Sequence, residues 1–166
     1  MYRRSVNKTE KIGIGFDSHR FIEGKPLMIG GIEVPYKFGL LAHSDGDVLI
    51  HSIIDALLGA CGLRDIGTLF PNSDGEYAGT DSKKLLVIVF EKILNEGFKV
   101  VNIDSTVIAE EPKLAPYIQK MRETIASILK MPFQNVNVKA KTNEGMGFIG
   151  KKEGIASISV VLVEKI

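Results

Sequence analysis

SDGDVLIHSIIDALLGAC, residues 44–61, predicts a helix that lies inside the protein. Apolar side chains cover most of its circumference, and a helix of that kind is largely buried. They are Val48, Leu49, Ile50, Ile53, Ile54, Leu57 and Leu58. Ser44 or Asp45 can accept hydrogen bonds from the free N–H groups of the first turn, so we expect the helix to run from Ser44 to about Ala60.

Three polar residues interrupt this apolar helix at intervals of four. Asp47, His51 and Asp55 therefore lie on one face, one above another. Burying charged groups without partners is strongly unfavourable. The polar stripe must therefore face solvent, pair internally or line a functional site, and the helix alone does not distinguish these possibilities.

The segments around this helix show β-type and helical patterns, without an internal repeat. Short apolar runs predict strands at residues 11–16, 26–36, 99–110, 136–141 and 154–165. Gly30 and Gly31 divide the second run as a two-residue hairpin turn. Helical patterns predict two further helices, at residues 82–97 with Gly97 as its stop and at about 116–130.

The order of these elements is β, β, β, α, α, β, α, β, β, which predicts an α+β domain with helices packed on one face of a β-sheet. The chain of 166 residues fits a single domain. We expect that domain at residues 11–166, after a flexible N-terminal extension of residues 1–10. Residues 61–81 have too few periodic apolar positions for a regular element, so we expect a mobile functional loop there.

Composition and charge exclude several classes of protein. The formal net charge of +1 gives no general reason to bind nucleic acid or an anionic membrane, so an anionic ligand needs a local site. Cys61 is the only cysteine, which excludes an internal disulfide framework and a CxxC motif. No apolar stretch approaches the about 20 residues that span a bilayer. We expect a cytoplasmic protein, or one from a plastid-type organelle after removal of a transit peptide.

Candidate metal ligands lie in two separate segments. Side chains two apart share one side of an extended segment, so Asp17 and His19 can point the same way. A catalytic zinc commonly takes three His or carboxylate ligands, and His51 would complete the set. His43 and Ser44 precede the helix, whose first N–H groups can hold a phosphate. The alternatives are a polar turn at Asp17, a solvated helix face at His51, and a Ser44 that only caps the helix beside an exposed His43.

VKAKTNEGMGFIGKKEG, residues 138–154, combines glycines with lysines. Glycines let backbone N–H groups approach an anion, and lysines neutralise it. Glu144 in this segment suits a Mg²⁺ ion that bridges phosphates. The alternative is an ordinary exposed hairpin between the two flanking strands.

Taken together, four stretches resemble the 2-C-methyl-D-erythritol 2,4-cyclodiphosphate synthase family of the non-mevalonate isoprenoid pathway. They are GIGFDSHRF (13–21), GLLAHSDGDVLIHSIIDALLGACGLRDIGTLFPNSD (39–74), AEEPKLAPY (109–117) and VNVKAKTNEGMGFIGKKEGIA (136–156). The resemblance spans Lys11 to the C-terminus, in the order and spacing of the family.

The resemblance implies a homotrimer of α+β subunits with active sites between neighbouring subunits. The substrate would be 4-diphosphocytidyl-2-C-methyl-D-erythritol 2-phosphate. Its 2-phosphate attacks the β-phosphorus of the diphosphocytidyl group, which gives 2-C-methyl-D-erythritol 2,4-cyclodiphosphate and releases CMP. Phosphoryl transfer of this kind is accelerated mainly by positioning and by charge stabilisation. No nucleic acid or membrane is expected as a partner.

The resemblance also implies roles for individual residues. One Zn²⁺ per active site would bind Asp17, His19 and His51, and Glu144 would bind Mg²⁺ or Mn²⁺ across the diphosphate. His43 and Thr142 would be catalytic, as stabilisers of the transition state. The substrate would contact Ser44, Asp65, Ile66, Gly67, Phe70, Pro71, Asn72, Ser73, Asp74, Ala109, Pro112, Lys113, Leu114, Ala115, Lys141, Asn143, Phe148 and Lys151. Asp55 would orient a ligand rather than bind the metal.

The chain departs from the family at a few positions. Ser18 stands where Val is usual, Lys141 and Asn143 replace threonines, and Lys151 replaces a common Arg. Because Lys and Arg bind phosphate with different geometry, a two-point contact at Lys151 can become a single one. Three other functions remain open at this point: a non-catalytic metal-dependent module that binds a cytidine nucleotide, a zinc phosphohydrolase, and an α+β domain whose polar stripe is merely solvated.

Overall fold

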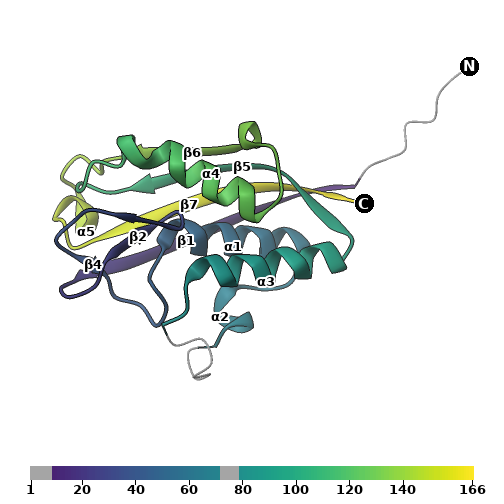
Figure 1. Ribbon diagram of the computed structural model, residues 1–166, viewed down its shortest axis with the longest axis horizontal. Helices are drawn as coiled ribbons and strands as arrows, with labels where there is room; N and C mark the ends of the chain where they lie inside the picture. Colours follow the sequence, from purple (N-terminus) through teal and green to yellow (C-terminus); the bar gives the residue numbers. More distant parts are fainter. Residues whose placement is uncertain (1–8, 72–78) are drawn as a thin grey trace, which may run out of the picture.

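The computed structural model describes residues 9–71 and 79–166 and contains a five-stranded sheet with helices packed on it (Figure 1). The strand order is β4-β1-β7-β5-β6. The strands are β1 (Glu10–Ile22), β4 (Gly39–Leu40), β5 (Phe98–Ile108), β6 (Val136–Lys141) and β7 (Gly154–Lys165). Neighbouring strands run antiparallel, except that β5 and β6 are parallel. The expected α+β class is confirmed, with a mixed sheet.

Three long helices lie on the same side of the sheet (Figure 1). Helix α1 (Val48–Cys61) packs directly on β1 and β7, α3 (Ser82–Asn95) packs on α1, and α4 (Ile118–Ile128) packs on β6. Two single-turn helices, α2 (Ile66–Leu69) and α5 (Gly147–Gly150), and the 3₁₀ turns η2 (Ala115–Tyr117) and η3 (Phe133–Asn135) complete the helical elements of the described residues. The helix predicted at 44–60 is confirmed as the centre of the core, because most of α1 is buried.

Two glycines of β1 allow α1 to lie unusually close to the sheet. A Cβ atom at Gly13 would lie 1.9 Å from the carbonyl oxygen of Ala56, and one at Gly15 would lie 1.9 Å from that of Ser52. Both contacts are with helix backbone, which cannot rotate away as a side chain can. The strand and the helix therefore approach each other backbone to backbone at this point.

A separate hairpin, β2 (Leu27–Ile29) and β3 (Ile32–Val34), confirms the predicted two-residue turn at Gly30 and Gly31. Both glycines have positive φ, as this kind of turn requires. The carboxylate of Asp47 accepts the N–H groups of Gly30 and Gly31, at 2.9 and 2.7 Å. It also accepts the N–H of Ile50, at 3.0 Å, and so caps α1. The expectation that Ser44 or Asp45 caps the helix is wrong, because the free N–H group of Ile50 donates to Asp47, three residues before it.

Three other elements differ from expectation. Strand β1 continues through Phe21, so Asp17 and His19 lie in a strand and not in a polar turn. Helix α2 lies within residues 61–81, where no regular element was expected, and Asp65 caps it by accepting the N–H of Thr68. Strands β6 and β7 are separated in the sheet by β5, so the Gly-rich segment between them is not a hairpin.

The face of the sheet opposite the helices exposes apolar side chains of β1 and β7. Their exposed fractions are 73% for Ile12, 70% for Ile14, 56% for Phe16, 37% for Ile158 and 41% for Val160. On β1 these residues alternate with the glycines that face α1, as expected for a strand. None of the described helices covers this apolar face.

Two sets of expectations fall partly outside the described residues. The expected extension ends at residue 10, the first residue of β1, and residues 1–8 are not described, so the division into extension and domain remains a prediction. The expected mobile loop includes residues 72–78, and with them Asn72, Ser73 and Asp74. Within residues 9–71 and 79–166, none of the helices combines the length and the apolar character needed to cross a membrane.

Candidate metal centre

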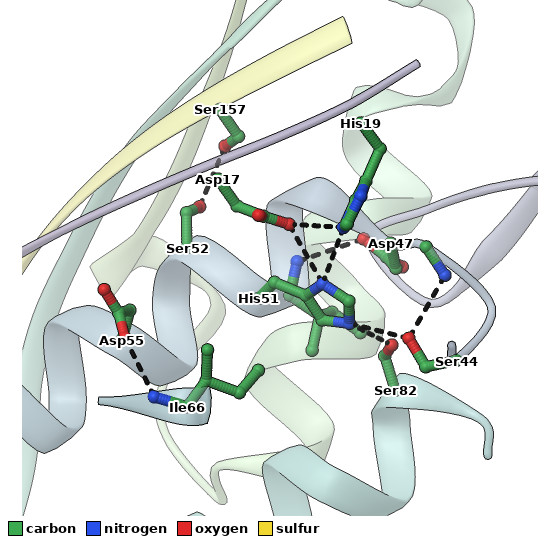
Figure 2. Close-up of polar contacts among 12 residues, drawn as sticks. Asp17, His19, Ser44, Asp47, His51, Ser52, Asp55, Ile66, Ser82 and Ser157 are labelled. Atoms are coloured by element: carbon green, nitrogen blue, oxygen red, sulfur yellow. Dashed lines mark hydrogen bonds and ion pairs between the residues drawn. The ribbon is translucent and has the colours of Figure 1, made fainter. Parts of the chain in front are cut away.

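Asp17, His19 and His51 meet where β1 crosses the N-terminal half of α1 (Figure 2). Positions 13, 15, 17 and 19 of β1 lie on the face of the strand that is turned toward the helix, so the two contact glycines are followed by two polar residues on the same face. Asp17 Oδ2 lies 2.9 Å from His19 Nε2 and 2.9 Å from His51 Nδ1, and the two imidazole nitrogens are 3.3 Å apart. The close approach of strand and helix therefore brings the three groups together.

These three atoms fit a small cation with mixed nitrogen and oxygen ligands. Zinc bonds to His and carboxylate ligands are about 2.0–2.2 Å long, so two ligand atoms of a tetrahedral site lie about 3.3 Å apart. The observed separations of 2.9 to 3.3 Å are close to that value. Calcium prefers six to eight oxygen ligands, and two imidazoles do not suit it. The carboxylate and imidazole of β1 are partly exposed, which leaves an approach for a further ligand.

Asp17 and His51 shift each other's pKa in opposite directions. Burial alone would raise the pKa of Asp17, but hydrogen bonds and charge from His19 and His51 lower that pKa to about 2. Burial alone would lower the pKa of His51, but the hydrogen bond and charge of Asp17 raise it above its usual value, and the charges of Asp47 and Asp45 add to this. Without a cation, Asp17 therefore favours the protonated form of His51. Metal binding must displace that proton.

The second ring nitrogen of His51 contacts two hydroxyl groups on the other side of the ring (Figure 2). His51 Nε2 lies 2.8 Å from Ser82 Oγ and 3.1 Å from Ser44 Oγ. Ser82 is the first residue of α3, is fully buried, and was missed by the sequence analysis. From the sequence, Ser82 indicates only the start of a helix. Its contact with His51 was not predictable, because it depends on the packing of α3 on α1.

The polar stripe of α1 serves three different purposes. His51 belongs to the candidate metal centre, whereas Asp47 is fully buried and holds the β2–β3 turn. Asp55 accepts the N–H of Ile66 at 3.0 Å and so attaches α2 to α1 (Figure 2). The expectation that Asp55 orients a metal ligand is not met by this contact, since the hydroxyl groups of Ser44 and Ser82 are the ones beside His51.

A second group of predicted site residues assembles between the segment after β5 and the segment after β6. The N–H of Ala109 donates to the carbonyl of Lys141 at 2.8 Å. Glu110 Oε1 accepts the N–H groups of Asn143 at 2.8 Å and Gly145 at 3.3 Å. The hydroxyl of Thr142 donates to Glu144 Oε1 at 2.8 Å.

Two acidic residues that the sequence analysis did not assign hold this second group together. Glu110 supports the turn on both sides of Glu144, whose φ is +51°. Glu111 pairs with Lys152 at 2.5 Å and accepts the hydroxyl of Tyr36 at 3.2 Å. Because their partners lie about 30 to 75 residues away along the chain, no local pattern indicates these contacts.

The remaining predicted site residues occupy different environments. Phe70, Ala109 and Leu114 are buried, and Ile66 and Pro112 are half-buried. The exposed ones are His43, Asp65, Gly67, Pro71, Lys113, Ala115, Lys141, Phe148 and Lys151. Glu144 and Thr142 are also exposed, in the segment after β6. The backbone of His43 accepts the N–H of Gly79 at 2.7 Å, which joins the loop before α1 to the loop before α3.

Known proteins resemble this chain over nearly its whole length. The YgbB family matches residues 10–164. A curated relative from Clostridioides difficile, a 2-C-methyl-D-erythritol 2,4-cyclodiphosphate synthase, is 53% identical over 153 residues, which cover 92% of this chain and 95% of the relative.

Solved structures share both the fold and substantial identity. The bifunctional IspDF from Campylobacter jejuni matches with a TM-score of 0.93 and 44% identity over 96% of this chain, which spans only 43% of that longer protein. A 2C-methyl-D-erythritol-2,4-cyclodiphosphate synthase in a CDP-bound form matches with a TM-score of 0.85 and 35% identity, over 92% of this chain and 99% of that one.

Proposed function

Because the chain belongs to the YgbB family, with 2-C-methyl-D-erythritol 2,4-cyclodiphosphate synthases as its relatives, we propose that its two assembled groups of residues perform that reaction. The chain is such a synthase, a lyase that acts on phosphorus–oxygen bonds in the non-mevalonate pathway. The observation that carries the proposal for the site is the meeting of Asp17, His19 and His51 at one point of the fold.

The substrate is 4-diphosphocytidyl-2-C-methyl-D-erythritol 2-phosphate. An oxygen of its 2-phosphate forms a bond to the β-phosphorus, and the bond between that phosphorus and the oxygen that bridges to the α-phosphate breaks. The electron pair leaves with CMP, and both phosphates of the product come from the substrate. Because attacking and leaving groups belong to one molecule, holding them in line supplies much of the acceleration. The CDP-bound relative supports a cytidine diphosphate ligand.

Two divalent cations belong to this proposal. Asp17, His19 and His51 would hold Zn²⁺. Glu144 would hold Mg²⁺ or Mn²⁺ beside the diphosphate. When bound, such ions neutralise phosphate charge and fix phosphate oxygens in position. Thr142, whose hydroxyl reaches Glu144, orients this carboxylate and stabilises the charge that develops during transfer. His43 has the same stabilising role from the loop before α1, and Ser44 contacts a phosphate.

The other predicted residues form the walls of the substrate site. Asp65, Ile66 and Gly67 face the methylerythritol hydroxyls, and the stretch 70–74 contacts the substrate. Residues 109–115 hold the cytidine, supported by the contacts of Glu110 and Glu111 with the segment after β6. Phe148 and Lys151 complete the pocket, and Lys141 and Asn143 contact the substrate from the same segment. A cytoplasmic location is part of the proposal, and cell fractionation tests it.

We also infer that three copies of the chain assemble, with each active site between two subunits. The exposed apolar face of β1 and β7 supports this, because a monomer gains little from leaving such a surface in water.

The activity is tested by incubating the protein with the substrate, Zn²⁺ and Mg²⁺. CMP and a cyclic diphosphate should form in equal amounts, and chromatography and ³¹P NMR measure both products. In H₂¹⁸O no label should enter the products, since water is not a reactant. Label incorporation would instead identify a phosphohydrolase, and tight CDP binding without CMP release would identify a nucleotide-binding module.

Two variants separate the metal sites. Glu144→Gln should lower turnover strongly while zinc content stays near one per chain, whereas His51→Ala should remove zinc as well. Glu123→Gln, on the exposed surface of α4, is the matched control for loss of a carboxylate. If Glu144→Gln loses zinc to the same extent as His51→Ala, the assignment of two separate metal sites is wrong.

A further inference from the structure

His51 presents its two ring nitrogens to opposite surroundings. Nδ1 faces Asp17 and His19 in the candidate metal centre, at 2.9 and 3.3 Å. Nε2 faces the start of α3, where Ser82 Oγ is its nearest partner at 2.8 Å. A neutral imidazole carries one proton, so the partner of Nε2 determines which nitrogen has a lone pair for a cation.

The direction of the hydrogen bond between His51 and Ser82 follows from Asp45. The Ser82 hydroxyl makes a very short hydrogen bond to Asp45 Oδ1, and the Ser82 N–H donates to Asp45 Oδ2 at 2.9 Å. An ionised carboxylate only accepts hydrogen bonds, so the single hydroxyl proton of Ser82 points to Asp45. Toward His51, Ser82 then offers a lone pair. His51 Nε2 must therefore donate its proton to Ser82.

Packing protects this arrangement from competing partners. Ser82 is fully buried and His51 is nearly so, which keeps bulk water from replacing the hydroxyl. The N–H of Asp45 donates to the carbonyl of Thr80 at 3.3 Å, so backbone contacts hold the loop before α1 against the loop before α3. Ser44, the second hydroxyl near Nε2, accepts the N–H of Gly46 at 3.3 Å and lies farther from the ring than Ser82.

We propose that Asp45 and Ser82 are positioning residues that keep the proton of His51 on Nε2 and so direct the lone pair of Nδ1 to the cation. This inference rests on the proposed zinc site, and it adds two residues that the resemblance to the family did not place in the site. Neither residue is one of the three that form the candidate metal centre. They act through His51, in the way that outer hydrogen bonds commonly orient metal ligands.

Zinc affinity is the first readout, measured by competition with a chromogenic chelator at fixed pH on the full chain. Ser82→Ala and Asp45→Ala should each weaken zinc binding by about 10- to 100-fold. Asp45→Ala is the sharper test, because it leaves Ser82 beside His51 but frees the hydroxyl proton to point at Nε2. Ser52→Ala is the matched control, since Ser52 is buried next to His51 in α1 but contacts Ser157 and Ser159 instead. It should bind zinc as the unmodified chain does.

A second readout needs no variant. In zinc-loaded protein with ¹⁵N-labelled histidine, NMR should show a proton on His51 Nε2 and a metal-bound Nδ1. A His51 that carries its proton on Nδ1 and binds zinc through Nε2 would overturn the proposal, as would unchanged zinc affinity in both variants. Failure of the unmodified chain to bind zinc would refute the proposed metal site itself, which distinguishes the two outcomes.

Discussion

Substituting Gly15 with alanine should both destabilise the protein and open the candidate metal centre. The new Cβ atom would lie 1.9 Å from the carbonyl oxygen of Ser52 and 2.6 Å from the backbone nitrogen of Ala56. Ordinary contact begins at 3.4 Å, so α1 must retreat from β1 by about 1.5 Å. His51 adjoins Ser52 and moves with the helix, whereas Asp17 stays with the strand.

The expected magnitudes follow from that displacement. Overpacking a well-filled core costs about 1–3 kcal/mol, and we expect the upper end because both obstacles are backbone atoms. The 2.9 Å separation of Asp17 Oδ2 and His51 Nδ1 would grow to about 4 Å. Metal–ligand distances tolerate changes of only about 0.2 Å, so zinc affinity should fall by more than about tenfold.

Gly59→Ala is the control on the same helix. The nearest atom to a Cβ at Gly59 is the carbonyl oxygen of Ile14, at 3.9 Å, so there is room for the methyl group. Alanine inside a helix is about 0.5–1 kcal/mol more favourable than glycine, so this variant should gain stability.

Urea unfolding followed by far-UV circular dichroism compares both variants with the unmodified chain. Protein concentrations are matched, since the stability of an oligomer depends on concentration. A Gly15→Ala protein as stable as the unmodified chain, with the same zinc affinity, would refute the argument that backbone contact between β1 and α1 builds the site.

Three further perturbations test other parts of the structure. Asp47→Ala leaves three buried N–H groups without their acceptor, so the free energy of urea unfolding should fall by at least about 3 kcal/mol. Asp47→Asn keeps one acceptor oxygen and should lose less stability. Equal small losses in the two variants would contradict the assigned role. The pKa of Asp17 is lowered to about 2, so its ionised form stabilises the metal-free protein above about pH 4. The free energy of unfolding should therefore fall by about 2 kcal/mol as the pH falls from about 4 to about 2. Asp17→Asn should lose less stability over that range, and an identical acid titration of the two proteins would disprove the assignment. Ile14→Glu places a charge on the exposed apolar face, and the mass measured by light scattering should fall from that of the proposed trimer to that of a monomer. Lys120→Glu on the exposed surface of α4 should leave the mass unchanged. A persistent assembly of the Ile14→Glu protein would rule out this face as the interface.

The elements with strong local patterns were predictable. The apolar circumference of the helix predicted at residues 44–60 indicated that it is buried, and the Gly30 and Gly31 pair indicated a hairpin turn, because both signals depend only on neighbouring residues. The start of α1 was misplaced because several residues in SDGD can cap a helix, and only the position of the β2–β3 turn favours Asp47. Helix α2 was missed because a single turn has too few residues for a periodic pattern.

The residues of the candidate metal centre were predictable in part from their spacing, and their grouping into one ligand set came from the resemblance to the synthase family. The spacing of Asp17 and His19 places both on one side of a strand, and His51 was one of three polar residues at intervals of four in an otherwise apolar helix. The structure brings these three together within 4.8 Å. Ser82, which supports His51, and Glu110, which supports the turn around Glu144, were not predictable, since their partners lie 31 to 35 residues away along the chain.

The sequence by itself determined which side chains share a face, because the helix and strand repeats place them there without help from the rest of the chain. It also indicated which chemical groups could form the candidate metal centre. Tertiary structure alone decided which of the three polar residues of α1 meets β1, since that depends on how closely the helix lies to Gly13 and Gly15. It also decided that the start of α3 meets His51 Nε2. Such contacts depend on the packing of distant segments, which local periodicity does not contain.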